Sequence, residues 1–248
     1  MISKLLLLMM IGHVLGDFYF QTEKIAKQKE KMFKGVLIHS LEYYIALLCV
    51  EIPFISIDLF LCATYMAIAH LFIDAIKYII IKKKKIRKTG IIFVVDQFFH
   101  ILSIFILAYY MNCINFHVTN FKIVENVFTT FDIDKVIIAK WILALLVLHI
   151  PANILIQNLL SGYKPREQGE KLIEIDNKIG RKIGTIERYI MFMFIAMDQY
   201  AAMGLVLTAK SIARYDKIAK DEKFAEYYLL GTLLSTMCVV FCKMVILK

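Results

Sequence analysis

Residues 90–111 read GIIFVVDQFFHILSIFILAYYM, and this apolar run decides the fold of the chain. A helix rises about 1.5 Å per residue, so about 20 apolar residues cross the ~30 Å hydrocarbon core of a bilayer. The run has no glycine or proline after its first residue, and its only acidic or imidazole side chains are Asp96 and His100. It is therefore predicted to form a transmembrane helix that carries two polar side chains inside the membrane.

Six further apolar runs flank this one in the sequence. They cover residues 1–20, 36–54, 57–81, 136–160, 189–209 and 224–247. Hydrophobic side chains make up 60% of the 248 residues and the mean hydropathy is +0.66, which is more than a soluble domain of this size could bury. Backbone groups inside a bilayer must bond to one another, and no alternating strand pattern is present, so each run is expected to be a helix.

These runs predict an all-α fold, a polytopic transmembrane helical bundle of about six to seven membrane helices. No repeat or low-complexity segment interrupts the chain, so residues 1–248 are expected to form a single transmembrane domain. Within it, residues 1–111 would make four helices that bear the site, and residues 136–248 the C-terminal helices. The first run has no small-x-small cleavage site, so we expect it to be retained rather than removed as a secretory signal.

The basic residues lie between the apolar runs, where they predict the orientation of the chain. Segments 22–34, 82–88 and 161–184 carry an excess of Lys and Arg over Asp and Glu, and segment 112–135 does not. By the positive-inside rule, the three basic segments should be cytoplasmic and the N-terminus outside. The net charge of +9 is thus explained by membrane topology, and we expect no nucleic-acid partner.

The sixth run, residues 189–209, does not fit this alternation. A full crossing would place the basic residues that follow it, such as Lys210 and Arg214, on the outer face. Either the run is re-entrant or broken, which Asp198 and Gly204 inside it would favour, or the cations are held for a reason other than topology. Both alternatives are compatible with the sequence.

Histidine and aspartate inside the first four apolar runs form the most informative pattern. Three runs carry a His and an Asp spaced i,i+4 and one carries a lone His: His13 with Asp17, His70 with Asp74, Asp96 with His100, and His39. Residues four apart share one helix face, about 5–6 Å apart at Cβ. Counted inward from the basic segments, all of them fall at a similar depth in the cytoplasmic half of the membrane. A shared intramembrane site near the cytoplasmic face is therefore expected.

Ionisable side chains at that depth are costly unless they are paired, hydrated or bound to a metal ion. Imidazole and carboxylate are the ligands expected for Zn²⁺, Fe²⁺ or Mn²⁺, so a divalent metal ion is the expected cofactor. Such an ion would neutralise the buried carboxylates and would lower the pKa of a bound water, giving a nucleophile near neutral pH. The alternative is that the pairs are hydrogen-bonded and only hold the helices together.

A second group of polar residues lies in the C-terminal third, where Arg188 enters the sixth run and Lys210 and Arg214 follow it. Cations held against their topological preference would suit a phosphate or another anionic head group. Each of them alone is also typical of solvated charge at the membrane surface. The candidate substrate-binding residues are therefore Gln21, Lys77 and Gln97 around the His/Asp site, and Arg188, Lys210, Arg214 and Glu226 in the C-terminal third.

The motifs taken together resemble a family. In order along the chain they are HVLGDFYFQT (13–22), HLFIDAIK (70–77), DQFFH (96–100), GRKIGTIER (180–188), AKSIAR (209–214) and AEYYLLGTLLS (225–235). This ordered set resembles the bacterial integral membrane proteins grouped as domain of unknown function 3307, and the resemblance covers nearly the whole chain. It implies a multi-pass protein of the bacterial cytoplasmic (inner) membrane, and it implies no particular activity.

The His-x-x-x-Asp pattern is also similar to that of membrane-bound metal-dependent hydrolases, as an analogy of site only. That analogy would make metal ligands or acid–base groups of His13, Asp17, His70, Asp74, Asp96 and His100. The candidates for catalysis are Asp17, His39 and Asp96, with a side chain that is not bound to the ion acting as base.

These expectations favour metal-dependent hydrolysis or transfer on an amphiphilic substrate, anionic or phosphate-bearing, reached among the membrane lipids. An ion- or proton-coupled transporter or channel would use the same residues but should expose them to both faces in turn. A structural membrane assembly protein would need the pairs only for packing. The polar residues gather in one half of the membrane, which favours an enzyme or a sensor over a transporter.

Overall fold

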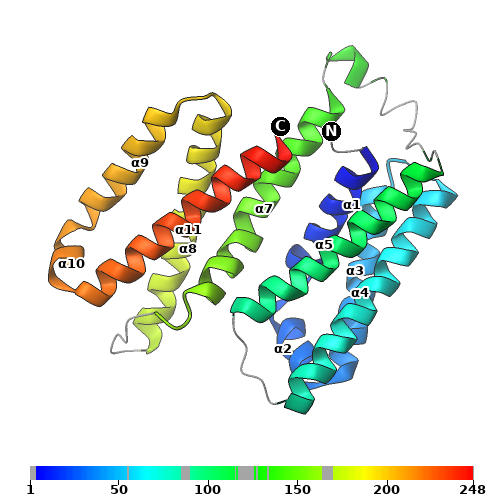
Figure 1. Cartoon of the computed structure of the whole chain (residues 1–248), viewed down its shortest axis with the longest axis horizontal. Helices are drawn as coiled ribbons and strands as arrows, with labels where there is room; N and C mark the ends of the chain where they lie inside the picture. The colour runs from blue at the N-terminus through cyan, green and yellow to red at the C-terminus, as the bar shows by residue number, and fades with distance from the viewer. Residues whose placement is uncertain are drawn as a thin grey trace. The chain divides into compact units, whose positions relative to one another are not determined.

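The computed structural model of the chain describes residues 4–54, 56–84, 90–114, 116, 126, 128–132, 134–163 and 170–247, without the side chains of residues 30, 84 and 170–178. Every regular element in these ranges is a helix, as the sequence predicts (Figure 1). In chain order they are α1 (Lys4–Val14), the π-helical turn η1 (Leu15–Tyr19), α2 (Glu23–Lys31), α3 (Phe33–Glu51), α4 (Ile57–Lys84), α5 (Gly90–Cys113), α7 (Lys135–Leu159), α8 (Glu170–Ala196), α9 (Tyr200–Ala213), α10 (Tyr215–Lys220) and α11 (Glu222–Ile246).

Five of these helices, α3, α4, α5, α7 and α11, are long and apolar enough to cross a membrane. A sixth span results if α1 with η1 is taken together with α2, a pair that bends by 89° at its break. The structure is therefore close to the predicted polytopic bundle of about six to seven membrane helices.

The helix α5 shows the polarity of a membrane-embedded bundle. Its outward face carries large apolar side chains, among them Phe98, Phe105 and Ile106, which are 59%, 49% and 61% exposed. Its buried face carries Asp96 and His100. An apolar outside with a polar inside suits a lipid-facing bundle, because hydrocarbon solvates apolar side chains and excludes charged ones.

The sixth apolar run, residues 189–209, is a broken helix. The helix α8 ends at Ala196 and α9 begins at Tyr200, and Asp198 between them has a positive φ of 57°. The helix α9 packs back against α8. The structure therefore has a broken helix, which is one of the alternatives that the sequence allows. The side of the membrane on which Lys210 lies stays a prediction.

The chain divides into two compact units, Met1–Leu146 and Val147–Lys248, and the division falls within α7. The sequence divides it elsewhere, into a site-bearing half 1–111 and C-terminal helices 136–248. That all of it forms one domain stays a prediction.

The first unit is built around α3, which packs against α1, α2 and α4. Two glycines let α1 and η1 approach α3 closely: a Cβ on Gly12 would lie 2.7 Å from Leu47 Cδ2, and one on Gly16 would lie 2.6 Å from Tyr43 Cδ2. Small residues at a helix crossing permit such an approach. Tyr43 belongs to the apolar core of this unit and also bonds to His13, so it joins the core to the polar cluster.

The helix α2 turns sharply from η1 and lies against α3. Thr22 caps its start by accepting a hydrogen bond from the Ile25 N–H at 3.3 Å. The contact with α3 depends on Gly35, because a Cβ there would collide with the backbone of Gln28 and Lys29. As a result, the Lys29 side chain is only 13% exposed, although it belongs to a lysine-rich segment.

Candidate metal centre

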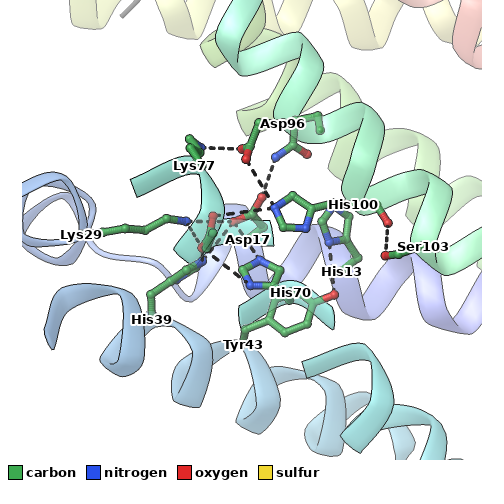
Figure 2. A network of polar contacts seen from close by, with 12 residues as sticks. His13, Asp17, Lys29, His39, Tyr43, His70, Lys77, Asp96, His100 and Ser103 are labelled. Carbon is green, nitrogen blue, oxygen red and sulfur yellow. Dashed lines mark hydrogen bonds and ion pairs between the residues drawn. The ribbon is translucent and has the colours of Figure 1, made fainter. Parts of the chain in front are cut away.

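Seven buried His and Asp side chains of the first unit converge (Figure 2). They are His13 on α1, Asp17 on η1, His39 on α3, His70 and Asp74 on α4, and Asp96 and His100 on α5. None of them is more than 7% exposed. The structure thus brings together every His and Asp that the sequence places at one depth.

Asp17 has partners on both carboxylate oxygens. Its Oδ1 lies 3.1 Å from His39 Nε2, at hydrogen-bond distance, and its Oδ2 accepts a hydrogen bond from Gln97 Nε2 at 2.7 Å. His70 Nε2 is 3.5 Å from the same Oδ1, and Lys29 Nζ is 3.9 Å from it. Asp17 lies in the π-helical turn η1, a distortion of the α-helix that often occurs at functional sites. It therefore links α3, α4 and α5 at one carboxylate.

Asp74 lies among three imidazoles and one ammonium group. Its Oδ2 is 2.5 Å from Lys29 Nζ and 3.7 Å from both His39 Nε2 and His70 Nδ1. Its Oδ1 is 3.8 Å from His100 Nε2. The imidazole distances exceed the usual hydrogen-bond range, so the nitrogens face this carboxylate without bonding to it.

Asp96 forms a second ion pair with a lysine. Lys77 Nζ donates to Asp96 Oδ2 at 2.5 Å, and Asp96 Oδ1 lies 3.7 Å from His100 Nε2. Lys77 is one of the residues that the sequence proposes for substrate binding. The structure places it at the cluster, paired with a carboxylate and 25% exposed.

His13 lies beside the other imidazoles and bonds to a tyrosine. Its Nδ1 is 3.2 Å from the Tyr43 hydroxyl, and its ring centroid is 5.6 Å from that of His100. The Tyr43 ring in turn stacks on His70 with centroids 3.9 Å apart. The other nitrogen of His13, Nε2, is buried and has no hydrogen-bond partner among the described residues.

Unbonded polar atoms are concentrated in this cluster. Among the described residues, the buried atoms of the cluster that lack a hydrogen bond include His13 Nε2, His39 Nδ1, His70 Nδ1 and Nε2, His100 Nε2, Asp74 Oδ1 and Asp96 Oδ1. Each buried donor or acceptor that stays unbonded costs about 1–3 kcal/mol. So many of them in one place are compatible with a bound ion or with ordered water, either of which would compensate the cost.

Three overlapping groups of these side chains have ligand geometry. In each group the ligand atoms lie within 4.8 Å of one another: Asp17, His70 and His100; His39, His70 and Asp74; and Asp74, Asp96 and His100. Two atoms that each lie about 2.1 Å from a tetrahedral ion are about 3.4 Å apart. The nitrogen–oxygen separations of 3.5 to 3.8 Å in the cluster exceed that value by a few tenths of an ångström. For these nitrogen–oxygen pairs, small side-chain shifts would bring both atoms to the distance that a divalent ion requires.

The charges of the cluster favour a cation. Three carboxylates face the ammonium groups of Lys29 and Lys77, which leaves one negative charge in excess when the imidazoles are neutral. A buried charge without a partner is strongly destabilising. A metal ion bound here would therefore gain from the field of the carboxylates as well as from its ligands.

The other predicted substrate-binding residues fall in different places. Gln97 belongs to the cluster through Asp17, and Gln21 is half-buried at the bend between η1 and α2. Arg188, Lys210, Arg214 and Glu226 lie in the second unit. There the structure does not gather them into one site: Lys210 Nζ is 2.6 Å from Glu187 Oε2, Arg214 lines a pocket formed by residues 212–217, and Glu226 is exposed.

Arg188 is buried and binds backbone and side-chain oxygens of its own unit. Its Nε donates to the Leu148 carbonyl at 2.7 Å, and its Nη2 donates to Asn153 Oδ1 at 2.7 Å and to Thr185 Oγ1 at 3.2 Å. Pro151 lies within the same stretch of α7 and has no N–H, so this turn has one helical hydrogen bond fewer. Arg188 therefore bonds to α7 on both sides of the proline.

Two members of the cluster are not among the residues singled out from the sequence. The sequence does contain a pattern that indicates a place for Tyr43 in the cluster, because Tyr43 follows His39 by four residues and so shares its helix face. No sequence pattern indicates a place for Lys29 in the cluster, because its lysine-rich segment is fully explained by membrane topology. Only the bend before α2 brings its ammonium group to Asp74.

The fold and the site together place this chain in a class of proteins: helical membrane proteins with several spans and a buried His/Asp cluster. The family model described as "Protein of unknown function (DUF3307)" matches residues 5–130, half of the chain, and the chain belongs to this family. The matched segment contains all seven His and Asp of the cluster, whereas the motifs after residue 180 lie outside it. No curated protein and no solved structure matches the chain.

Proposed function

We propose that the His/Asp cluster binds a divalent metal ion and catalyses hydrolysis or group transfer on an amphiphilic, phosphate-bearing substrate. The observation that carries the proposal is the set of buried, unbonded ring nitrogens and carboxylate oxygens contributed by α1, α3, α4 and α5. Metal coordination would satisfy the ligand atoms among them, because a neutral imidazole offers the lone pair of one nitrogen and a carboxylate offers its negative charge.

The donor set limits the choice of metal. Imidazole nitrogen with carboxylate oxygen, and no thiolate, suits Zn²⁺, Fe²⁺ and Mn²⁺. The free cysteines of the chain do not belong to the three ligand groups. A metal held by three such ligands keeps a position for water, whose pKa it lowers to near neutrality.

His13 is the candidate for proton transfer. It does not belong to any of the three ligand groups found among the described residues, and its Nε2 is buried and unbonded beside His100. In hydrolysis, water oxygen would bond to phosphorus while the ester P–O bond breaks. The imidazole would take the proton that the water loses and return it to the leaving oxygen.

The surroundings of the cluster suggest the class of substrate. Lys29 and Lys77 line it with positive charge, which suits phosphate oxygens, and the helices that carry it expose apolar faces. Both features together suit a molecule with an anionic head and an apolar part. We place the cluster near the cytoplasmic face of a bacterial inner membrane, with the N-terminus outside, on the basis of the lysine-rich segments.

Metal analysis of the purified protein tests this function. The full chain would be purified in detergent without chelators, supplied with Zn²⁺ or Mn²⁺, and compared with the variants Asp74→Asn and Asp58→Asn. Asp58 is the matched control, because it lies on the same helix α4 and is exposed. Phosphate release from phosphatidic acid in mixed micelles and from p-nitrophenyl phosphate would be measured on the same samples.

The proposal expects stoichiometric metal in the wild type and in Asp58→Asn, and its loss in Asp74→Asn. Metal-dependent phosphate release should follow the same order, with Asp74→Asn at least about 100-fold slower. Wild-type protein that binds neither ion would overturn the metal function and leave structural pairing as the role of the cluster.

The ion pairs favour a second candidate, an ion- or proton-coupled transporter. Lys29 and Lys77 each hold a carboxylate next to an imidazole, which is an arrangement that can pass protons when ion pairs exchange. Reconstitution into vesicles with a pH-sensitive dye inside discriminates the two. Proton flux that is lost in Asp74→Asn, together with absence of bound metal, would favour transport over hydrolysis.

A further inference from the structure

Asp74 is the carboxylate whose two oxygens face different ligands. Its Oδ2 lies 3.7 Å from His39 Nε2 and from His70 Nδ1, whereas its Oδ1 lies 3.8 Å from His100 Nε2. Asp96 Oδ1 lies 3.7 Å from that same nitrogen of His100. One buried side chain thus stands between a set of ligands on α3 and α4 and a second set on α5.

The three ligand groups overlap, and each pair of groups has a different residue in common. The group of His39, His70 and Asp74 and the group of Asp74, Asp96 and His100 have only Asp74 in common. The remaining group shares an imidazole with each of these two. A carboxylate can bind a separate ion through each oxygen, and the two oxygens of Asp74 already face separate sets.

We infer that the cluster is a dinuclear centre in which Asp74 bridges two divalent ions. This inference rests on the proposed function, because it takes the cluster to be a metal site. Ions in two-metal sites lie about 3.5–4 Å apart, a separation that one carboxylate spans. His39 and His70 would hold the first ion once the His39 Nε2–H bond to Asp17 is given up, and Asp96 and His100 would hold the second.

The lysines support two positions for positive charge. Lys29 Nζ lies 2.5 Å from the Asp74 oxygen that faces the first set. Lys77 Nζ lies 2.5 Å from the Asp96 carboxylate in the second set, a pair that Figure 2 labels. Each half of the cluster therefore has its own ammonium group. Each ammonium group occupies a carboxylate position that a divalent ion would take over, so the carboxylates offer two positions for a cation.

A centre with two ions restricts the chemical class of the substrate more than a centre with one ion would. Four positive charges added to the one negative charge in excess leave the centre cationic, so it requires an anionic ligand. A phosphate ester suits it, because two of its oxygens can each bind one ion. A water held at the centre would form the new bond to phosphorus while the ester P–O bond breaks, and the leaving oxygen would receive the proton that the water lost.

Manganese serves as the probe for this centre. The metal-free full chain in detergent would be titrated with Mn²⁺ and studied by metal analysis and by electron paramagnetic resonance at low temperature. Two Mn²⁺ ions bridged by a carboxylate are exchange-coupled, whereas an isolated ion gives an uncoupled six-line spectrum. The variants are Asp96→Asn, which removes a ligand of one ion only, and Asp58→Asn as the matched control on an exposed position of α4.

The inference expects two Mn²⁺ per chain and a coupled spectrum in the wild type and in Asp58→Asn. Asp96→Asn should bind one Mn²⁺ with an uncoupled spectrum. One uncoupled ion per wild-type chain would overturn the dinuclear centre and leave the metal function standing. No bound ion in the wild type would overturn both, so the two failures are distinguishable without any assay of activity.

Discussion

Lys29 Nζ lies 2.5 Å from Asp74 Oδ2, and this ion pair joins the amphipathic helix α2 to a carboxylate whose side chain is 0% exposed. The lysine thereby places a tethered cation where the proposed metal would bind. Metal and lysine should therefore compete for the same carboxylate, and the stability of the protein should show it.

Replacing Lys29 by methionine should destabilise the metal-free protein and leave the metal-bound protein almost unchanged. Removal of one partner of a buried ion pair costs about 3–5 kcal/mol, because the other charge is left without compensation. A divalent ion at Asp74 supplies that compensation. Thermal unfolding in detergent, with and without saturating Mn²⁺, measures both states.

Lys27→Met is the control, since Lys27 lies on the same helix and is exposed, and it should unfold like the wild type. An equal loss of stability in Lys29→Met with and without Mn²⁺ would show that Lys29 and the ion do not share a position.

Gly35→Ala should loosen α2 from α3. A Cβ at this position would collide with the backbone of Gln28 and Lys29, which a side-chain rotation cannot relieve. Overpacking of this kind costs about 1–3 kcal/mol. Gly204→Ala in α9 meets nothing within 4 Å and should gain up to about 1 kcal/mol from helix propensity. Thermal unfolding of the two variants should therefore shift in opposite directions, and shifts of the same sign would contradict the close contact at Gly35.

Tyr43→Phe should slow phosphate release without removing metal. The change deletes the hydroxyl that lies 3.2 Å from His13 Nδ1, so the imidazole loses the partner that orients its other nitrogen. We expect a fall of about 5-fold in kcat with little change in KM, since one hydrogen bond is worth about 1 kcal/mol. Tyr44→Phe, whose hydroxyl bonds to Thr64 Oγ1 at 3.1 Å, should retain full activity. Loss of metal from Tyr43→Phe would instead assign this hydroxyl to support of the ligands.

Arg188→Met should destabilise the second unit by about 2–4 kcal/mol, because the Leu148 carbonyl and the Asn153 side chain lose buried hydrogen bonds. The N–H that Pro151→Ala returns would bond to the Val147 carbonyl and not to the Leu148 carbonyl that Arg188 binds, so the effects of the two changes should be additive. A double-mutant cycle followed by thermal unfolding measures the coupling between them.

Lys182→Met, an exposed change on the same helix α8, serves as its control and should have little effect. Effects of Arg188→Met and Pro151→Ala that are not additive would show that the arginine does compensate for the proline.

The helical class and the convergence of the His and Asp residues were predictable for a common reason. Apolar runs of membrane-spanning length force helices, and i,i+4 spacing puts Asp96 and His100 on one face of such a helix. Depth below the lysine-rich segments then places His13 and His70 at the same level of the bundle. Both arguments are local, because they need only distances along a single helix.

The contacts within the cluster were not predictable in the same way. Asp74 and Asp17 look alike in sequence, each four residues after a histidine, yet Asp17 bonds to Gln97 while Asp74 faces three imidazoles and Lys29. Which carboxylate becomes central depends on how far the helices rotate about their axes. Hydropathy patterns do not resolve that rotation when the whole outer surface is apolar.

The sequence by itself thus determined that this chain is a helical membrane protein with ionisable side chains at one depth, because the cost of exposing charge to hydrocarbon is set by residue type and position. Only the tertiary structure decided that Lys29 reaches the cluster, that Arg188 bonds to α7 around Pro151, and that Asp74 stands between two sets of ligands. These contacts join helices far apart in the chain, and they depend on close approaches, such as that at Gly35, whose geometry arises only when the helices pack.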